Sequence, residues 1–473
     1  MPSSAASRAE RKRLSPMGNE ALFREKGVWR AIIALVVPSV LTILIMVVYN
    51  IADMFFISML GDDDQVAAVA VVGPIFSLAT AVATMIGAGG CAVIARTLGA
   101  GDREQARTLS SLCIWAAIGF GAVFSLLLLS ATAPILRLLG ATENLIPHAG
   151  TYMRILALGS PLMLFSLAMA STIRAEGIIL PGMISNMAGT VTNLLLDPLF
   201  ILSFKMGVAG AALATVLGNL VSSVMLVFAM RKHASLMAFS PRYALRKPVL
   251  LLQILAVGLP NGISSILSGL ASTFSNRLLN AYGSGAIAAM AAAGRSVLVI
   301  TMVQMGICIG VSPLLAYNYG ARDSARLRES LQKTALLTAG FGFLSAAGCW
   351  LGREHLLALF LKDAANLALG SRFLFWLILA SPFLGFFYLS SNFLQAAGKA
   401  FQATLVSVLR QGVLLIPALY LMHDFFGLTG IAAAHTAADF GAILAASVLG
   451  LRGYRQIAAA DNLVNTSWKC DSF

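Results

Sequence analysis

Long apolar stretches, separated by short polar segments, dominate the chain between residues 31 and 450. A membrane-spanning helix needs roughly 20 mainly apolar residues, and the pattern predicts twelve of them. The first six are expected at about 31–59, 66–95, 108–132, 148–172, 182–204 and 207–230, and the second six at about 249–281, 286–317, 334–352, 371–395, 402–422 and 428–450. We therefore predict an all-α membrane protein.

Basic residues alternate between the two ends of the predicted spans. The N-terminal segment and the even-numbered connections carry bases, whereas the odd-numbered connections are poor in them, and Gly61–Gln65 holds three aspartates and no base. Cytoplasmic loops of membrane proteins carry an excess of Lys and Arg. We therefore expect a multi-pass protein of the cell membrane, plasma or bacterial inner, with both termini in the cytoplasm.

The chain also repeats itself at a nearly constant offset of 220 to 222 residues. Four pairs of positions show it: Pro38 and Pro260, Gly61 and Gly283, Gly99–Asp102 and Gly320–Asp323, and Gly207–Gly210 and Gly427–Gly430. Each half holds six spans, so the halves are parallel repeats related by a pseudo-two-fold axis along the membrane normal, with a cleft between them. The predicted organisation is a basic cytoplasmic segment (1–30), a six-helix lobe (31–230), a cytoplasmic linker (231–248), a second six-helix lobe (249–450) and a cytoplasmic tail (451–473).

Composition excludes several other classes of protein. The chain is 58% hydrophobic and 11% charged, whereas soluble domains are roughly 25% charged. The net charge of +13 comes from bases in short linkers, so we expect the lipid bilayer, and no nucleic acid, as a partner. We also expect the protein to be a monomer. The five cysteines form no CxxC pair, and no ATP-binding loop or HExxH motif is present. We therefore expect neither an enzyme nor a resident cofactor.

Ionisable groups at membrane depth are costly and mark candidate functional sites. Asn193 and Asp197 in the fifth span are four residues apart and share one helix face, and Thr215 in the sixth span can add a hydroxyl. Asp53 and Tyr49 are likewise four apart in the first span. Such an oxygen-rich pocket suits Na⁺ or, through paired carboxylates, a proton. The alternative is that these side chains only join neighbouring helices by hydrogen bonds.

The second lobe lacks this pattern. Its matching positions are Ser275 or Asn276 and an apolar run from Val413 to Ala418, so the cation site should be confined to the first lobe. Arg295 and Arg410 are the deep cations, which either face an anionic substrate or pair with a fixed partner inside the second lobe. The sequence leaves their roles open, and with them those of His435 and Asp439.

The sequence resembles the multidrug and toxic compound extrusion (MATE) family over nearly all of the chain beyond the basic N-terminus. The resemblance rests on segments that occur in order and at family spacing: Pro38, Tyr49–Asp53, Gly99–Asp102, Asn193–Pro198, Gly207–Ala212, Tyr317–Ala321 and Arg410–Gly412 followed by Pro417. It implies twelve helices in two lobes and export of cationic, lipophilic, drug-like compounds by antiport with Na⁺ or H⁺.

By matching motifs, the resemblance also assigns residue roles. Asp53, Asn193, Asp197 and Thr215 would form the cation site, Pro38 would bend the first span, and Tyr49 would lie beside the site. Some branches of the family also use acids in spans seven and ten. This chain has Asn276 and Gln395 there, which is similar to the Mep-type and DinF-type exporters.

Two other functions compete with export. A flippase of the same superfamily for lipid-linked oligosaccharides should line its cleft with several arginines, and only Arg295 and Arg410 lie deep. A membrane-embedded transferase needs acids or histidines that bind a metal near one membrane face. The Asp62–Asp64 run has no further acids or histidines of this kind beside it in the sequence.

Overall fold

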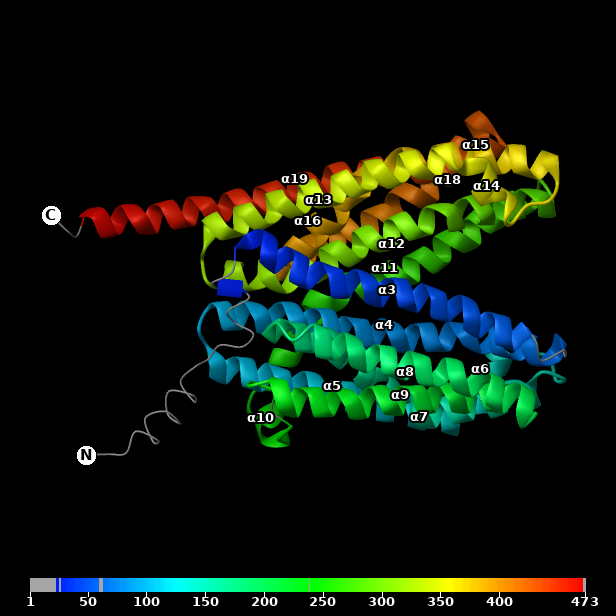
Figure 1. The fold of residues 1–473 in the computed structure, drawn as a ribbon, viewed down its shortest axis with the longest axis horizontal. Helices are drawn as coiled ribbons and strands as arrows, with labels where there is room; N and C mark the ends of the chain where they lie inside the picture. Colours follow the sequence, from blue (N-terminus) through cyan, green and yellow to red (C-terminus); the bar gives the residue numbers. More distant parts are fainter. Residues whose placement is uncertain (1–22, 25–26, 59–62, 238, 471–473) are drawn as a thin grey trace.

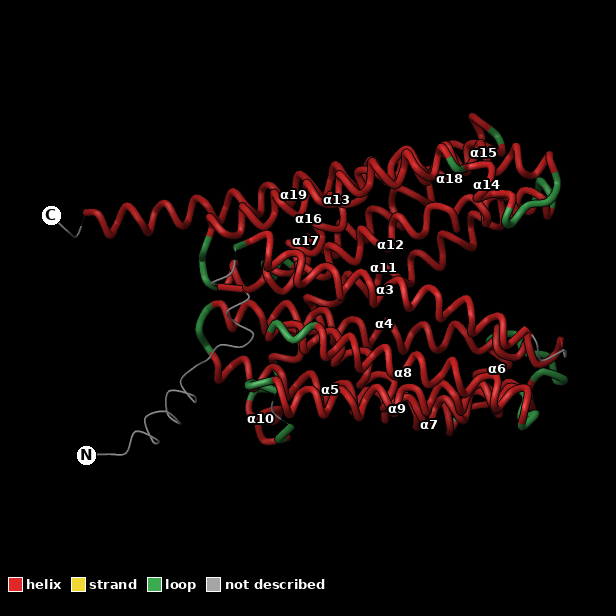
Figure 2. Tube along the Cα trace, viewed as in Figure 1, coloured by secondary structure: helices red, strands yellow, loops and turns green. Residues whose placement is uncertain are grey.

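The computed structural model describes residues 23–24, 27–58, 63–237 and 239–470, with the backbone alone for 48–58, 63 and 457–470. Within that part, nearly every residue is helical and no strand occurs (Figure 2). The long helices lie side by side in two groups (Figure 1). The predicted all-α fold of two lobes is confirmed.

Six helical units build each lobe. The first lobe contains α3 (Val28–Ser58), α4 (Asp63–Gly99), α5 (Arg103–Ser130), α7 (Ile146–Thr172), α8 (Leu180–Pro198) and α9 (Val208–His233). The second contains α11 (Leu250–Asn280), α12 (Ser284–Gly320), α13 (Ser324–Leu351), α15 (Ala364–Ala380) with α16 (Leu384–Ala396), α17 (Ala400–Val408) with α18 (Leu415–Phe426), and α19 (Leu428–Cys470). Short helices α6 (Thr132–Leu138), α10 (Pro241–Arg246) and α14 (Arg353–Ala358) lie in connections.

Eleven segments of the described chain are long and apolar enough to cross a membrane, which makes this a multi-pass membrane protein. The remaining unit is the fifth expected span, where α8 runs into the π-helix η2 (Leu199–Ser203). It is not among the eleven, and one of its faces carries the polar residues Asn186, Asn193 and Asp197. At the C-terminus, α19 continues to Cys470, well beyond the expected end at residue 450.

The predicted repeat extends to backbone conformation. Asp102 (φ −85°, ψ 82°) caps the N-terminus of α5 through a hydrogen bond from the Gln105 amide, and Asp323 (φ −87°, ψ 82°) caps α13 in the same way. Gly101 precedes the first cap with a φ of 84°, and its counterpart Arg322 keeps a φ of 55° although it carries a Cβ. Gly207 (φ 60°) and Gly427 (φ 57°) form a further matched pair; Gly61 lies outside the described residues.

The lobes meet where α4 and α12 end. A Cβ at Gly99 would lie 2.0 Å from the carbonyl oxygen of Tyr317, and a Cβ at Gly320 would lie 1.9 Å from that of Arg96. Gly99 is equivalent to Gly320 in the repeat, and Arg96 to Tyr317, so the contact is reciprocal. Such a self-complementary contact is what a two-fold axis generates, and only glycine permits so close an approach of two backbones.

Buried apolar side chains join the lobes at this same end. One continuous cluster includes Ile32 and Ile94 of the first lobe together with Ile254 and Leu314 of the second. Other clusters stay within one lobe. Phe23, ahead of α3, is fully buried in the shared cluster, with its ring centroid 5.3 Å from that of Tyr317. The end of the molecule that carries the basic loops is therefore sealed between the lobes.

The linker between the lobes is fixed to the first one. The buried carboxylate of Glu176 accepts hydrogen bonds from the backbone amides of Ser235 and Leu236, at 2.8 and 3.3 Å. The Ser110 hydroxyl donates to the Leu236 carbonyl and the Ser111 hydroxyl to the Ser240 carbonyl, both at 2.9 Å. This part of the linker is an ordered part of the first lobe.

Candidate functional site in the first lobe

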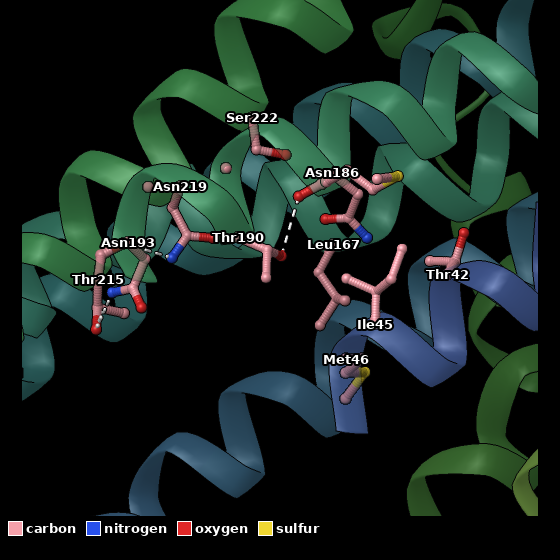
Figure 3. Close-up of a pocket in the computed structure, with 13 residues that line it drawn as sticks. Thr42, Ile45, Met46, Leu167, Asn186, Thr190, Asn193, Thr215, Asn219 and Ser222 are labelled. Atoms are coloured by element: carbon pink, nitrogen blue, oxygen red, sulfur yellow. Dashed lines mark hydrogen bonds between the residues drawn. The ribbon is translucent and has the colours of Figure 1, made fainter. Parts of the chain in front are cut away.

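A polar pocket of about 160 Å³ lies inside the first lobe, among α3, α7, α8 and α9. Helices α8 and α9 supply most of its polar side chains, and Ile45, Met46 and Leu167 supply apolar surface, as Figure 3 shows. The polar lining consists of Thr42, Asn186, Thr190, Asn193, Thr215, Asn219 and Ser222. Two of the predicted cation-site residues, Asn193 and Thr215, therefore lie in one pocket.

Hydrogen bonds hold these side chains in place. The Asn193 amide nitrogen donates to the Thr215 hydroxyl at 3.2 Å, and that hydroxyl donates to the Ala211 carbonyl at 3.0 Å. The Asn219 amide nitrogen donates to the Thr215 carbonyl at 2.9 Å, and its oxygen accepts from the Ser166 hydroxyl at 3.0 Å. The pocket thus presents positioned amide and hydroxyl oxygens, which are ligands that suit a hard cation.

Two glycines allow α8 and α9 to approach closely enough for this arrangement. A Cβ at Gly189 would lie 2.6 Å from the Gly218 carbonyl oxygen, and a Cβ at Gly218 would lie 2.7 Å from the Gly189 carbonyl oxygen. Small residues at such crossings bring helix backbones together in membranes. The crossing lies one turn before Asn193, which explains how its short side chain reaches α9.

Asp197 lies one turn beyond Asn193 on the same face of α8 and is fully buried. It is not among the residues that line the pocket. A buried carboxylate requires hydrogen bonds, a counter-charge or a proton. Burial of both Asn193 and Asp197 within the first lobe is the arrangement that the four-residue spacing predicts.

The first-span residues are described only in part. Asp53 and Tyr49 belong to α3, but their side chains lie outside the described residues, so their place beside the site stays a prediction. Pro38 lies inside α3, which continues through it as one helix. The Thr42 hydroxyl, which lines the pocket, donates to the Pro38 carbonyl at 2.8 Å. A change of helix geometry at Pro38 would therefore move the pocket wall.

In the second lobe, Arg410 has a fixed acidic partner. Its Nε lies 2.8 Å from Oδ1 of Asp439, and its Nη1 donates to the Tyr388 hydroxyl at 3.3 Å. The guanidinium carbon also lies 4.8 Å from the ring centroid of Phe387. Arg295 instead contacts an aromatic ring: its side chain is exposed on α12, and its guanidinium carbon lies 5.7 Å from the ring centroid of Phe360. The aromatic ring, rather than an acid, partners it there.

Sequence reasoning missed the lining residues Thr190 and Asn219. It also missed Ser166, which donates a hydrogen bond to Asn219. Their spacing in the sequence could have identified them, since Thr215 and Asn219 are four residues apart and Asn186, Thr190 and Asn193 lie on one helical face.

The four described cysteine side chains are free and buried, and no group of three metal-binding side chains occurs among the described residues.

Known proteins resemble this chain in sequence along most of its length. Multidrug export protein MepA of Staphylococcus saprophyticus is 30% identical over 410 residues, which cover 86% of this chain and 90% of that protein. MepA of Staphylococcus aureus is 29% identical over 412 residues, with the same coverage.

Solved structures share the fold. The crystal structure of a MATE protein in complex with MaD3S has a TM-score of 0.85 at 25% identity and covers 94% of this chain and 99% of that one. The Vibrio cholerae MATE transporter VcmN in its bent form has a TM-score of 0.85 at 24% identity and covers 91% and 98%.

The MatE family model matches the chain twice, over residues 38–199 and 260–421. The two matches begin at Pro38 and Pro260, the pair that first indicated the repeat, so the family model and the internal repeat describe the same two lobes. The chain therefore belongs to the MATE family of transporters.

Proposed function

We propose that this protein exports cationic, lipophilic organic compounds by antiport with Na⁺ or H⁺. The observation that carries the proposal is the buried carboxylate of Asp197 one turn from Asn193, beside an otherwise neutral pocket inside one lobe of a carrier fold. The MepA relatives are named multidrug export proteins, which supports this substrate class. The bases in the loops support an orientation in which the sealed end of the molecule faces the cytoplasm.

The coupling ion and the substrate oppose each other in this scheme. An ion that neutralises the carboxylate lets α3 and α8 draw together, whereas substrate is favoured by the open, negatively charged state. Each ligand can shift the balance only through its different affinity for the two states. Binding of the ion must therefore weaken binding of the substrate, and binding of the substrate must weaken binding of the ion by the same free energy, about 1–3 kcal/mol in typical cases.

The second lobe argues against a flippase for pyrophosphate-linked sugars. Such a substrate needs unpaired positive charge in the cleft, and the charge of Arg410 is balanced by Asp439 at 2.8 Å. Among the described residues, Arg295 then remains as an exposed cation at depth, and a single arginine is a poor match for a pyrophosphate.

The test is accumulation of a fluorescent organic cation in proteoliposomes under a Na⁺ gradient and, separately, a proton gradient. At least one gradient should drive transport, and Asp197→Asn should abolish the dependence on it. Asp424→Asn is the matched control, because the same change is made at an exposed carboxylate near a helix end. If neither gradient drives transport by the unmutated protein, the antiport proposal is wrong.

A further inference from the structure

The lining of the first-lobe pocket has a charged counterpart in the second lobe. At the offset of 220 residues, Thr190, Thr215 and Asn219 correspond to Arg410, His435 and Asp439. At the offset of 221 that relates Pro161 to Pro382, Leu167 corresponds to Tyr388. Two hydroxyls, an amide and an apolar side chain in one lobe are thus replaced by a guanidinium, an imidazole, a carboxylate and a phenol in the other.

These side chains meet inside the second lobe. Arg410 contacts Asp439 at 2.8 Å and Tyr388 at 3.3 Å, and the side chains of Arg410 and Asp439 are only 15% and 19% exposed. Arg410 belongs to the π-helix η4 (Leu409–Leu414), within the eleventh span. Single π-helical turns inside helices are rare and occur frequently at functional sites. The three residues come from η4, α16 and α19, so the cluster ties three helical segments together.

His435 adds a titratable group that has no hydrogen bond at one nitrogen. It lies one turn before Asp439 on the same face of α19, and its Nε2 atom is buried without a hydrogen-bond partner among the described residues. The helices packed around α19 contribute other charged or titratable groups nearer their ends or in adjoining turns: Arg277, Arg372, Lys399, His423 and Asp424. Arg410 and Tyr388 are the groups in direct contact with Asp439 or its partner.

We propose that His435 and Asp439, held by Arg410, form a proton-binding site in the second lobe, separate from the ion site of the first. The proposal rests on ion-coupled export as the function. With His435 neutral, the charges of Arg410 and Asp439 cancel. A proton transferred from hydronium breaks an O–H bond of that ion and forms an N–H or O–H bond within the cluster. The cluster then has a net charge of +1 until the proton returns to water. Because the two groups are neighbours, the proton belongs to the pair.

The cluster selects a proton over Na⁺. A guanidinium already occupies the position beside the carboxylate where a metal cation would sit, so Na⁺ would face unscreened repulsion at short range. A proton instead adds directly to the imidazole or the carboxylate. Once bound, it weakens the attraction between Arg410 and Asp439 and loosens η4 from α19. The added positive charge also disfavours a cationic substrate bound nearby, which is the sign that antiport requires.

Infrared difference spectra of the purified protein in lipid, recorded between pH 8 and pH 5, test the site without any substrate. We expect imidazole and carboxyl bands in the unmutated protein that His435→Gln and Asp439→Asn each alter. His423→Gln is the matched control, since that histidine bonds Tyr282 at the end of α18, and it should leave unchanged the carboxyl band that Asp439→Asn removes. Because Asp439→Asn leaves Arg410 without its counter-ion, the variant with Arg410→Gln and Asp439→Asn together provides a charge-neutral version that should fold.

The result that overturns the proposal is a set of spectra in which His435→Gln and the charge-neutral double variant both match the unmutated protein. This outcome is distinct from failure of the proposed function. If neither gradient drives transport but the bands are present and lost in the variants, the antiport proposal fails and the proton site stands. If transport is ion-driven and the bands are insensitive to both variants, the reverse holds.

Discussion

Replacement of Gly320 by alanine should shift this carrier toward the state that is open at its basic end. The added Cβ would lie 1.9 Å from the Arg96 carbonyl oxygen and 2.8 Å from the carbonyl carbon, and both are backbone atoms. Ordinary contact begins near 3.4 Å, so α4 and α12 must separate by about 1.5 Å, the difference between these distances. The sealed state cannot absorb this shift by rotating a side chain.

The magnitude follows from the cost of overpacking. Extra methyl groups in well-packed regions typically destabilise by about 1–3 kcal/mol. A state in which the lobes have parted at this end bears no such cost, so the equilibrium between the two states should move by roughly five- to 150-fold. Gly99→Ala acts on the reciprocal contact, with its Cβ 2.0 Å from the Tyr317 carbonyl oxygen. Since one separation relieves both clashes, the double variant should shift the equilibrium by less than the sum of the two.

Spin labels on cysteines placed at Arg103 and Arg328 report the distance between the lobes at this end. Both positions are exposed, and Cys470→Ser leaves only buried native cysteines. Gly320→Ala should enlarge the population with the longer distance. The matched control is Gly340→Ala, which adds the same methyl to a helix of the same lobe with no atom within 4 Å. Identical distance distributions for the two variants would refute the idea that the glycine crossing sets the equilibrium.

Three further outcomes follow from the described contacts. A cysteine at Ser284 should react with an impermeant reagent on intact cells and one at Ser240 only after permeabilisation; the opposite pattern would reverse the orientation. Glu176→Gln should weaken the hydrogen bonds that hold the linker, lower stability by about 1–3 kcal/mol and expose the linker to protease, and unchanged melting and cleavage would contradict this. Thr215→Val removes the acceptor for Asn193 and should weaken binding of the coupling ion about fivefold, from about 1 kcal/mol; equal ion titrations would show that this hydroxyl has no part in the site.

Much of the fold follows from the sequence because a bilayer imposes simple rules. Every backbone polar group must be satisfied within a span, so long apolar stretches become helices, and eleven of them are visible from apolarity alone. The fifth span carries the site, has a polar face and is not among these eleven. Its position was predictable because Asn193–Pro198 lies within it and Gly207 follows it, with Gly427 marking the same turn in the second lobe.

The pairings across the lobe interior were not predictable in the same way. Spacing on one helix brought Asn193 and Asp197 to one face, but nothing in the chain states that Arg410 meets Asp439, 29 residues away and beyond an intervening turn. Arg410 also lies in the π-helix η4, a local departure from α-helical geometry that the apolar pattern does not predict. Arg295 illustrates the same limit, since depth along a span does not reveal whether a side chain points into the lobe or out of it.

The repeated Gly-Ala-x-Asp segments need no ligand to explain them. In each lobe the aspartate caps the next helix, while the glycine forms half of the crossing between α4 and α12. The two glycine contacts are related by the pseudo-two-fold axis and join the same two helices, α4 and α12. Neither contact can therefore separate while the other stays in place. A seal of this kind opens as one unit, which suits a carrier that must never be open at both ends. The lobes can then differ freely in the chemistry of their interiors, a neutral pocket in one and an ion pair in the other, because the gate depends on backbone geometry that both share.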